Sequence, residues 1–222
     1  MAVEIEFLGH AGLLIRTGEH TIAVDPFLTG NPAAKKSADD IECDAIAVTH
    51  GHEDHFSDVP GIAKRTGATV FSSYEICAFL GEQGHEKCEP GNPGGEIKTP
   101  FGSVAFTQAF HSSSFQGRYM GMPMGVVVKA GGVNIYHMGD TALFGDIALI
   151  GKRHKPDVVF VPTGDRFTMG AEEGARAAEM SGAKLAVPIH YGTWPLLAAD
   201  ATGFKPSGCE VRLMQAGETL SF

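Results

Sequence analysis

The stretch HGHEDH, at residues 50–55, decides the fold. It follows directly on the apolar run AIAV at residues 45–48, which we expect to be a short buried β-strand. Imidazole nitrogens and carboxylate oxygens are the ligands that borderline divalent metals prefer. In a tight loop, the first two histidines can point one way while the aspartate and the last histidine point another. This pattern suits two metal ions about 3.5–4 Å apart, the usual separation in dinuclear sites.

A polar surface loop that happens to hold histidine is the alternative interpretation. A lone histidine would favour that alternative. Three imidazoles and a carboxylate within six residues, directly after an apolar strand, favour a metal site instead.

Three further candidate ligands also come just past apolar runs. His111 follows TQAF, Asp140 follows NIYHMG and His190 follows LAVPI. In open α/β sheets, functional sites gather outside the carboxyl ends of the strands. Each position alone is a weak signal, because a single histidine at a strand end is more often structural. Together with residues 50–55 they make a set of five histidines and two aspartates, which predicts one shared site.

The order of the apolar runs predicts an α/β protein with two sheets covered by helices. Short strand-like runs come first, mixed strands and helices follow, and strand-like runs return late. We expect a turn region over residues 89–99, a weak helix over 143–152, and a hairpin-like pair formed by VRLM and ETLSF in the tail. The length of 222 residues suits a single domain over residues 1–222.

Composition narrows the function classes. The chain has 17 Lys plus Arg against 26 Asp plus Glu, a formal charge of −9, so nucleic acid is not an expected partner. No run approaches the roughly 20 apolar residues that a membrane span needs, and the N-terminus has no signal-peptide pattern. The 4 cysteines are scattered without a Cys-x-x-Cys pair, which indicates free thiols in a reducing compartment. We therefore expect a cytoplasmic protein acting on a small molecule.

HGHEDH matches the His-x-His-x-Asp-His signature of the metallo-β-lactamase superfamily, and the downstream order of His, Asp after Gly, and late His matches too. The chain most resembles the ascorbate-6-phosphate lactonase-like branch, a group with many metal-dependent hydrolases. The resemblance covers nearly the whole chain. It implies an αββα four-layer sandwich, two mixed sheets flanked by helices, with the site along one edge, and it suggests a homo-oligomer. The segments similar to that branch are FLGHAG, VDPF, HSS, YHMGDTALF, TGDRFTMG and PIHYGTWP.

The resemblance also implies how the ligands divide between two divalent metal ions. Zinc is the expected metal, with manganese or iron as alternatives, because the same ligands accept all three. The first ion would be held by His50, His52 and His111, the second by Asp54, His55 and His190, and Asp140 would bridge both.

The expected reaction is hydrolysis. Two cations would lower the pKa of a shared water and generate hydroxide, which would attack a small lactone, ester or phosphoester. Asp54 and Asp140 are the expected catalytic carboxylates, and Asp54 could also carry a proton. The sequence contains no Gly-x-Ser-x-Gly elbow and no phosphate-binding Gly-x4-Gly-Lys-Ser/Thr loop, which agrees with water as the nucleophile.

Other residues are candidates for supporting roles. Asp25 either orients a ligand histidine or forms a turn before a proline, and the resemblance favours the first. His10 and His137, at strand ends, are expected to orient ligands or to be satisfied buried histidines. Arg118 could face an anionic substrate group. Arg118 belongs to a methionine-rich segment, residues 112–124. This segment either caps the site or packs as an irregular surface loop or subunit contact.

Two other functions share these ligands. A mono-iron thiol or persulfide dioxygenase can use the same fold, and a single bound iron with oxygen uptake would identify it. Diiron oxygen-reducing relatives typically carry Glu where this chain has His52, which disfavours them. A non-catalytic scaffold stabilised by metal is disfavoured by the intact ligand set.

Overall fold

Two seven-stranded sheets pack face to face in the computed structural model, which describes residues 2–222. Both sheets are mixed, with antiparallel and parallel pairs. The first sheet has the order β16 (Thr219–Ser221), β1 (Glu4–Gly9), β2 (Gly12–Arg16), β3 (Thr21–Val24), β4 (Ala45–Ala47), β5 (Thr69–Ser72) and β6 (Cys88–Pro90). The second has the order β15 (Glu210–Val211), β14 (Leu185–Ile189), β13 (Val158–Pro162), β12 (Val133–His137), β11 (Met124–Ala130), β8 (Gly102–Gln108) and β7 (Glu96–Thr99).

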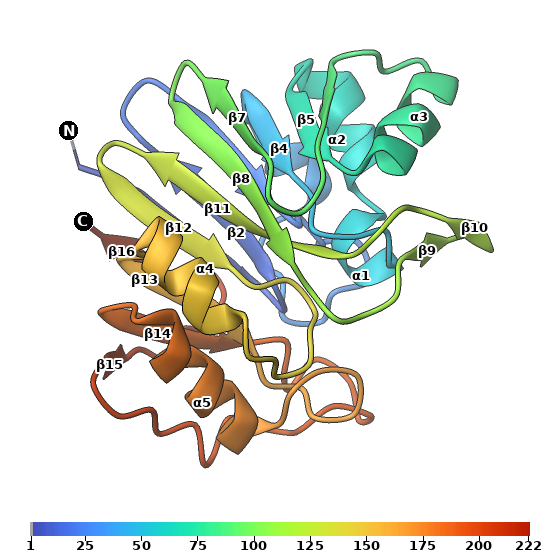
Figure 1. Ribbon diagram of the computed structural model, residues 1–222. Coiled ribbons are helices and arrows are strands. Elements are labelled where there is room, and N and C mark those ends of the chain that lie inside the picture. Colours follow the sequence, from blue (N-terminus) through green and yellow to red (C-terminus); the bar gives the residue numbers. More distant parts are fainter. Residues whose placement is uncertain (1) are drawn as a thin grey trace.

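Helices cover the outer face of each sheet, which gives four layers (Figure 1). α2 and α3 pack on the first sheet, and α4 and α5 pack on the second. Within the described residues, no helix is both long and apolar enough to cross a bilayer. The expected αββα sandwich is thereby confirmed. The helices are η1 (Ala38–Asp40), α1 (Glu53–Phe56), α2 (Val59–Thr66), α3 (Tyr74–Glu82), α4 (Ile147–His154) and α5 (Ala171–Ser181).

Strand alternation explains why both faces of a sheet are buried. On β2, Leu13 and Ile15 join the apolar cluster between the two sheets. Leu14, between them, points the other way into the cluster beneath α2 and α3. Side chains alternate along a strand, so an uninterrupted apolar run can serve two layers at once.

The strand directions place many carboxyl ends on one edge of the sandwich. β1 and β3 are each antiparallel to β2, and β3 is parallel to β4, so the ends of β1, β3 and β4 point the same way. In the second sheet, β8 and β12 are each antiparallel to β11, while β12, β13 and β14 are parallel. Loops that leave these strands therefore meet along a common edge.

Three local expectations were wrong. The tail is not a hairpin: β15 extends the second sheet beside β14, and β16 extends the first sheet beside β1. Residues 89–99 are not all turn, because edge strands β6 and β7 begin and end the segment, with backbone partners in β5 and β8. α4 begins and ends later than residues 143–152. In each case a distant partner strand or packed helix decides the local structure.

The contact between α4 and α5 provides a stability test. A Cβ at Gly151 of α4 would clash with the backbone carbonyl of Ser181, at the end of α5. Gly151→Ala should lower the free energy of unfolding by about 1–3 kcal/mol, measured by urea denaturation, because overpacking outweighs the gain in helix propensity.

The control is Gly81→Ala in α3, where an added Cβ meets nothing within 4 Å. This change should be neutral or stabilise by up to about 1 kcal/mol. Equal effects of the two substitutions would contradict the close approach of the helices.

Candidate metal centre

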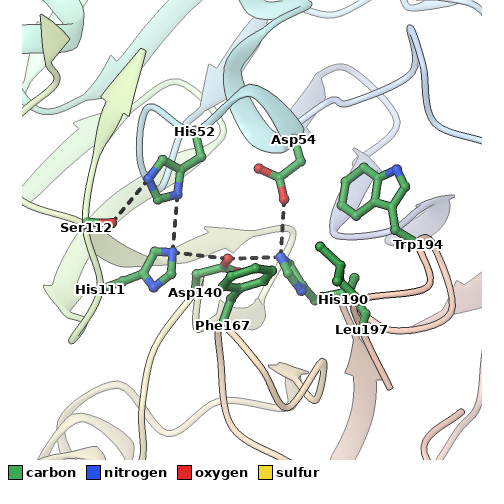
Figure 2. Close-up of a pocket in the computed structure, with 10 residues that line it drawn as sticks. His52, Asp54, His111, Ser112, Asp140, Phe167, His190, Trp194 and Leu197 are labelled. Carbon is green, nitrogen blue, oxygen red and sulfur yellow. Dashed lines mark hydrogen bonds and ion pairs between the residues drawn. The ribbon is translucent and has the colours of Figure 1, made fainter. Parts of the chain in front are cut away.

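The structure brings all seven predicted metal ligands together at the shared edge of the two sheets. His50 and His52 lie on the loop after β4, and α1 then carries Asp54 and His55. The other ligands come from loops of the second sheet: His111 follows β8, Asp140 follows β12 and His190 follows β14. Figure 2 shows several of these side chains converging from separate segments.

His50, His52 and His111 form the first cluster of ring nitrogens. His52 Nδ1 lies 3.0 Å from His50 Nε2 and 3.2 Å from His111 Nε2. Ligand atoms 2.0–2.1 Å from a tetrahedral zinc ion are about 3.3 Å apart. The spacing of these nitrogens therefore fits a single bound cation.

Asp54, His55 and His190 form the second cluster, with His10 beside them. Asp54 Oδ2 lies 3.4 Å from His190 Nε2 and 3.8 Å from His55 Nε2. This cluster therefore offers two imidazoles and a carboxylate, a donor set that divalent zinc, manganese and iron all accept.

The Asp140 carboxylate lies between the two clusters and is 3% exposed. Its Oδ2 is 2.9 Å from His190 Nε2 and 3.5 Å from His111 Nε2. Its Oδ1 is 3.4 Å from His55 Nε2. The Asp140 carboxylate is therefore close to donor atoms of both clusters and could serve both.

Several buried polar atoms of the cluster have no hydrogen-bond partner among the described residues. They are His55 Nε2, His190 Nε2 and Asp140 Oδ1. Buried polar groups are normally paired, and unpaired ones are costly. Metal ions coordinated by these atoms would remove that cost, so the residues present fit a metal centre.

The buried carboxylates of the site also need positive charge close to them. Burial alone would raise the pKa of Asp140, but His190 and His55 outweigh it and hold the pKa well below its usual range. Burial would lower the pKa of His190, yet Asp140 and Asp54 raise it to about 9. The buried carboxylates therefore stay ionised and need either protonated imidazoles or metal cations around them.

Asp25 lies behind the centre, fully buried, and contacts one of the candidate ligands. His55 Nδ1 donates to Asp25 Oδ2 at 2.8 Å, so Nε2 is the ring nitrogen that faces the cluster and could bind a metal ion. The Thr49 backbone N–H and hydroxyl also donate to Asp25, at 2.8 and 2.6 Å. Asp25 has φ 43°, a conformation that Asp and Asn tolerate better than most residues. These bonds hold the His55 ring in one orientation.

His10 forms a hydrogen bond with Asp54 of the second cluster. The Asp54 carboxylate can only accept, so His10 Nε2 donates to Asp54 Oδ2 at 3.1 Å. His10 Nδ1 then accepts from the Thr193 hydroxyl at 2.7 Å. Burial lowers the pKa of His10 to about 4, so the ring is neutral. His10 therefore positions Asp54, and Thr193, which the sequence did not single out, positions His10.

His137 and Arg118 lie outside the cluster. His137 Nε2 donates to the Ala11 carbonyl and its Nδ1 accepts from the Gly139 N–H, so both ring nitrogens are occupied by backbone. Arg118 lies on the hairpin of β9 (Ser114–Phe115) and β10 (Arg118–Tyr119), which projects from the body (Figure 1). Its guanidinium is paired with Glu82, because the hairpin carries it outward, away from the candidate ligands.

A cavity of about 420 Å³ opens over both clusters. Its floor consists of candidate ligands, and the other wall is apolar (Figure 2). The sequence did not predict this apolar wall, although the family-like segments TGDRFTMG and PIHYGTWP contain Phe167 and Trp194. The lining residues are His52, Asp54, His111, Ser112, Asp140, Phe167, His190, Trp194, Leu196 and Leu197.

Known proteins resemble this chain in sequence and fold. A family model described as a β-lactamase superfamily domain matches residues 4–190. A UPF0173 metal-dependent hydrolase of Shouchella clausii (strain KSM-K16) is 46% identical over 226 residues, covering 98% of this chain and 99% of that protein. One from Geobacillus thermodenitrificans (strain NG80-2) is 47% identical, with the same coverage. Igni18, a metallo hydrolase from the archaeon Ignicoccus hospitalis KIN4/I, superposes with a TM-score of 0.90 at 33% identity, covering 100% and 99% of the two chains.

The contact between Asp25 and His55 can be tested by Asp25→Asn. Asn keeps the shape and tolerates the same φ, but it cannot accept from His55 and Thr49 with a full negative charge. Zinc affinity, measured by competition with a chromogenic chelator, should fall roughly 10- to 100-fold. Asp39→Asn, at an exposed carboxylate of η1, is the matched control and should bind zinc as the parent does. Unchanged affinity in Asp25→Asn would contradict an orienting role.

Proposed function

The chain belongs to the metallo-β-lactamase superfamily of metal-dependent hydrolases, and we propose that it works through two divalent metal ions on either side of Asp140. The observation that carries this proposal is the pair of donor clusters separated by one buried carboxylate. Each cluster opens onto the same cavity, so a substrate there would meet both.

The proposed ligands follow the two clusters. Zinc is the first expectation, with manganese or iron as alternatives, because imidazole and carboxylate accept all three. When bound, such ions lower the pKa of a water molecule and polarise a carbonyl or phosphoryl oxygen. His50, His52 and His111 would hold one ion, Asp54, His55 and His190 the other, and Asp140 would contact both.

The chain's own groups complete the reaction. Asp54 lines the cavity, and its Oδ2 accepts from His10, which fixes the carboxylate. In that position Asp54 can take a proton from water and return it to the leaving group. Phe167 and Trp194 line the same cavity and would limit the water that reaches the reacting atoms. The proposed substrates are small lactones, esters or phosphoesters.

The thiol dioxygenase alternative finds no support in the comparisons. The relatives described above, which are at least 33% identical and cover nearly the whole chain, are named as hydrolases. The candidate ligands also lie on both sides of Asp140, whereas a mono-iron site would need ligands on one side only.

Metal stoichiometry tests the dinuclear site. Protein purified without chelator should contain two divalent ions per chain by elemental analysis, as expected for a two-metal hydrolase. Asp140→Ala should lose metal from both clusters and reduce hydrolysis at least roughly 100-fold, because both ions would lose a shared ligand.

Asp146→Ala, an exposed carboxylate on the same connection, is the control and should keep both ions. One iron per chain that is unchanged by Asp140→Ala would overturn the dinuclear proposal.

Asp54→Ala tests the second carboxylate. Removing this group takes away a proposed ligand and the proposed proton carrier together. We expect kcat to fall roughly 100- to 10,000-fold, with metal occupancy measured on the same samples. If occupancy persists while kcat falls, proton transfer is the main role. If turnover does not change, Asp54 has neither role.

A further inference from the structure

The wall opposite the candidate ligands is built from two segments that the metal centre does not use. Phe167 comes from the connection after β13, and Trp194, Leu196 and Leu197 come from the loop after β14. The wall carries no hydrogen-bonding side chain apart from the indole N–H. Phe167 is 52% exposed and Leu196 is 58% exposed, although both are large and apolar. Exposed apolar side chains gathered at a cavity mark a surface that binds apolar groups.

Hydrogen bonds and aromatic packing fix the position of the two segments that carry the wall. The Ala198 N–H donates to the Gly164 carbonyl at 3.0 Å, which ties the two segments together. Trp194 packs against the His10 ring at 4.8 Å and the Phe27 ring at 5.8 Å between centroids. The neighbouring Thr193 hydroxyl donates to His10. A preorganised apolar surface binds an apolar group without an ordering cost.

Among the described residues, no lysine or arginine lines this cavity. Arg118 is paired with Glu82, far along the hairpin. Arg166 stacks on the Phe167 ring, 5.6 Å from the ring centroid, and is not a lining residue. A phosphate or carboxylate remote from the reacting bond would therefore meet no lysine or arginine among the lining residues, so the cavity offers its charge no buried partner.

Because the cavity joins the candidate ligands to an apolar wall without lysine or arginine, we propose that the substrate is a neutral ester or lactone. Its apolar substituent packs on Phe167, Trp194 and Leu196, and it carries no phosphate outside the reacting group. This inference rests on the proposed hydrolase function and narrows its substrate class. The cavity volume, about 420 Å³, is near the low end for ligand pockets, so the apolar group is short.

The first measurement is hydrolysis by the metal-loaded protein of 4-nitrophenyl acetate, butyrate and hexanoate, with 4-nitrophenyl phosphate as the anionic comparison. Burying each added methylene should raise kcat/KM about fourfold until the cavity is full. Phe167→Ala and Leu196→Ala should each flatten this dependence on chain length. Leu149→Ala, at a leucine of α4 that is 63% exposed, is the matched control and should keep it. Metal content of every variant is measured in parallel.

A second measurement does not need turnover. Trp194 is the only tryptophan in the chain, so its fluorescence reports on the wall directly. Acetohydroxamate, butyrohydroxamate and hexanohydroxamate carry a metal-binding head and chains of increasing length. Their dissociation constants, from Trp194 fluorescence, should fall about fourfold per methylene, and Leu196→Ala should flatten the series.

Ester hydrolysis and hydroxamate binding together distinguish failure of the proposed hydrolase function from failure of the proposed apolar binding site. If the hydroxamates show the chain-length dependence and no ester or lactone is hydrolysed, the apolar site stands and the hydrolytic proposal fails. If esters are hydrolysed at a rate independent of chain length, the wall does not bind substrate and the inference is overturned. It is also overturned if 4-nitrophenyl phosphate is the preferred substrate, because this ester is anionic rather than neutral.

Discussion

The burial of the Asp140 carboxylate is the constraint on which the rest of this structure depends. An ionised carboxylate that is 3% exposed cannot rely on water for its stabilisation. Imidazole nitrogens from both sheets surround it, and several of their atoms have no other partner. Such an arrangement is stable only with positive charge inside it. Protons on His55 and His190 can supply that charge, and two divalent cations supply it better, because they also satisfy the unpaired nitrogens.

Holding these groups together requires strand ends that do not move. The parallel directions within each sheet bring the ends of β1, β3, β4, β8, β12 and β14 to one edge. At that edge His10, Asp25 and His190 have φ of 56°, 43° and 62°, a region that non-glycine residues seldom occupy. The buried sheets on either side compensate for this local strain, which is a common feature of functional sites. The chain therefore turns sharply where its polar side chains must face inward.

The metal centre and the apolar wall are not independent. Thr193 donates to His10, and His10 donates to Asp54, so the loop that presents Trp194 is bonded to a candidate ligand. The His190 N–H also donates to the His10 carbonyl at 2.7 Å, which joins the two sheets at the same place. A change in the loop would therefore reach Asp54 through two hydrogen bonds. This connection links the position of the wall to the geometry of the reacting site.

The sequence by itself determined the fold class and identified the seven side chains that meet at the edge. HGHEDH is a local pattern, and His111, Asp140 and His190 each follow an apolar strand, so periodicity was enough to find them. Tertiary structure alone decided what depends on distant partners. Thr193 meets His10 across 183 positions, Arg118 turns to Glu82 and away from the cavity, and the two tail strands join different sheets. No local pattern encodes these contacts, because each depends on how whole layers pack together.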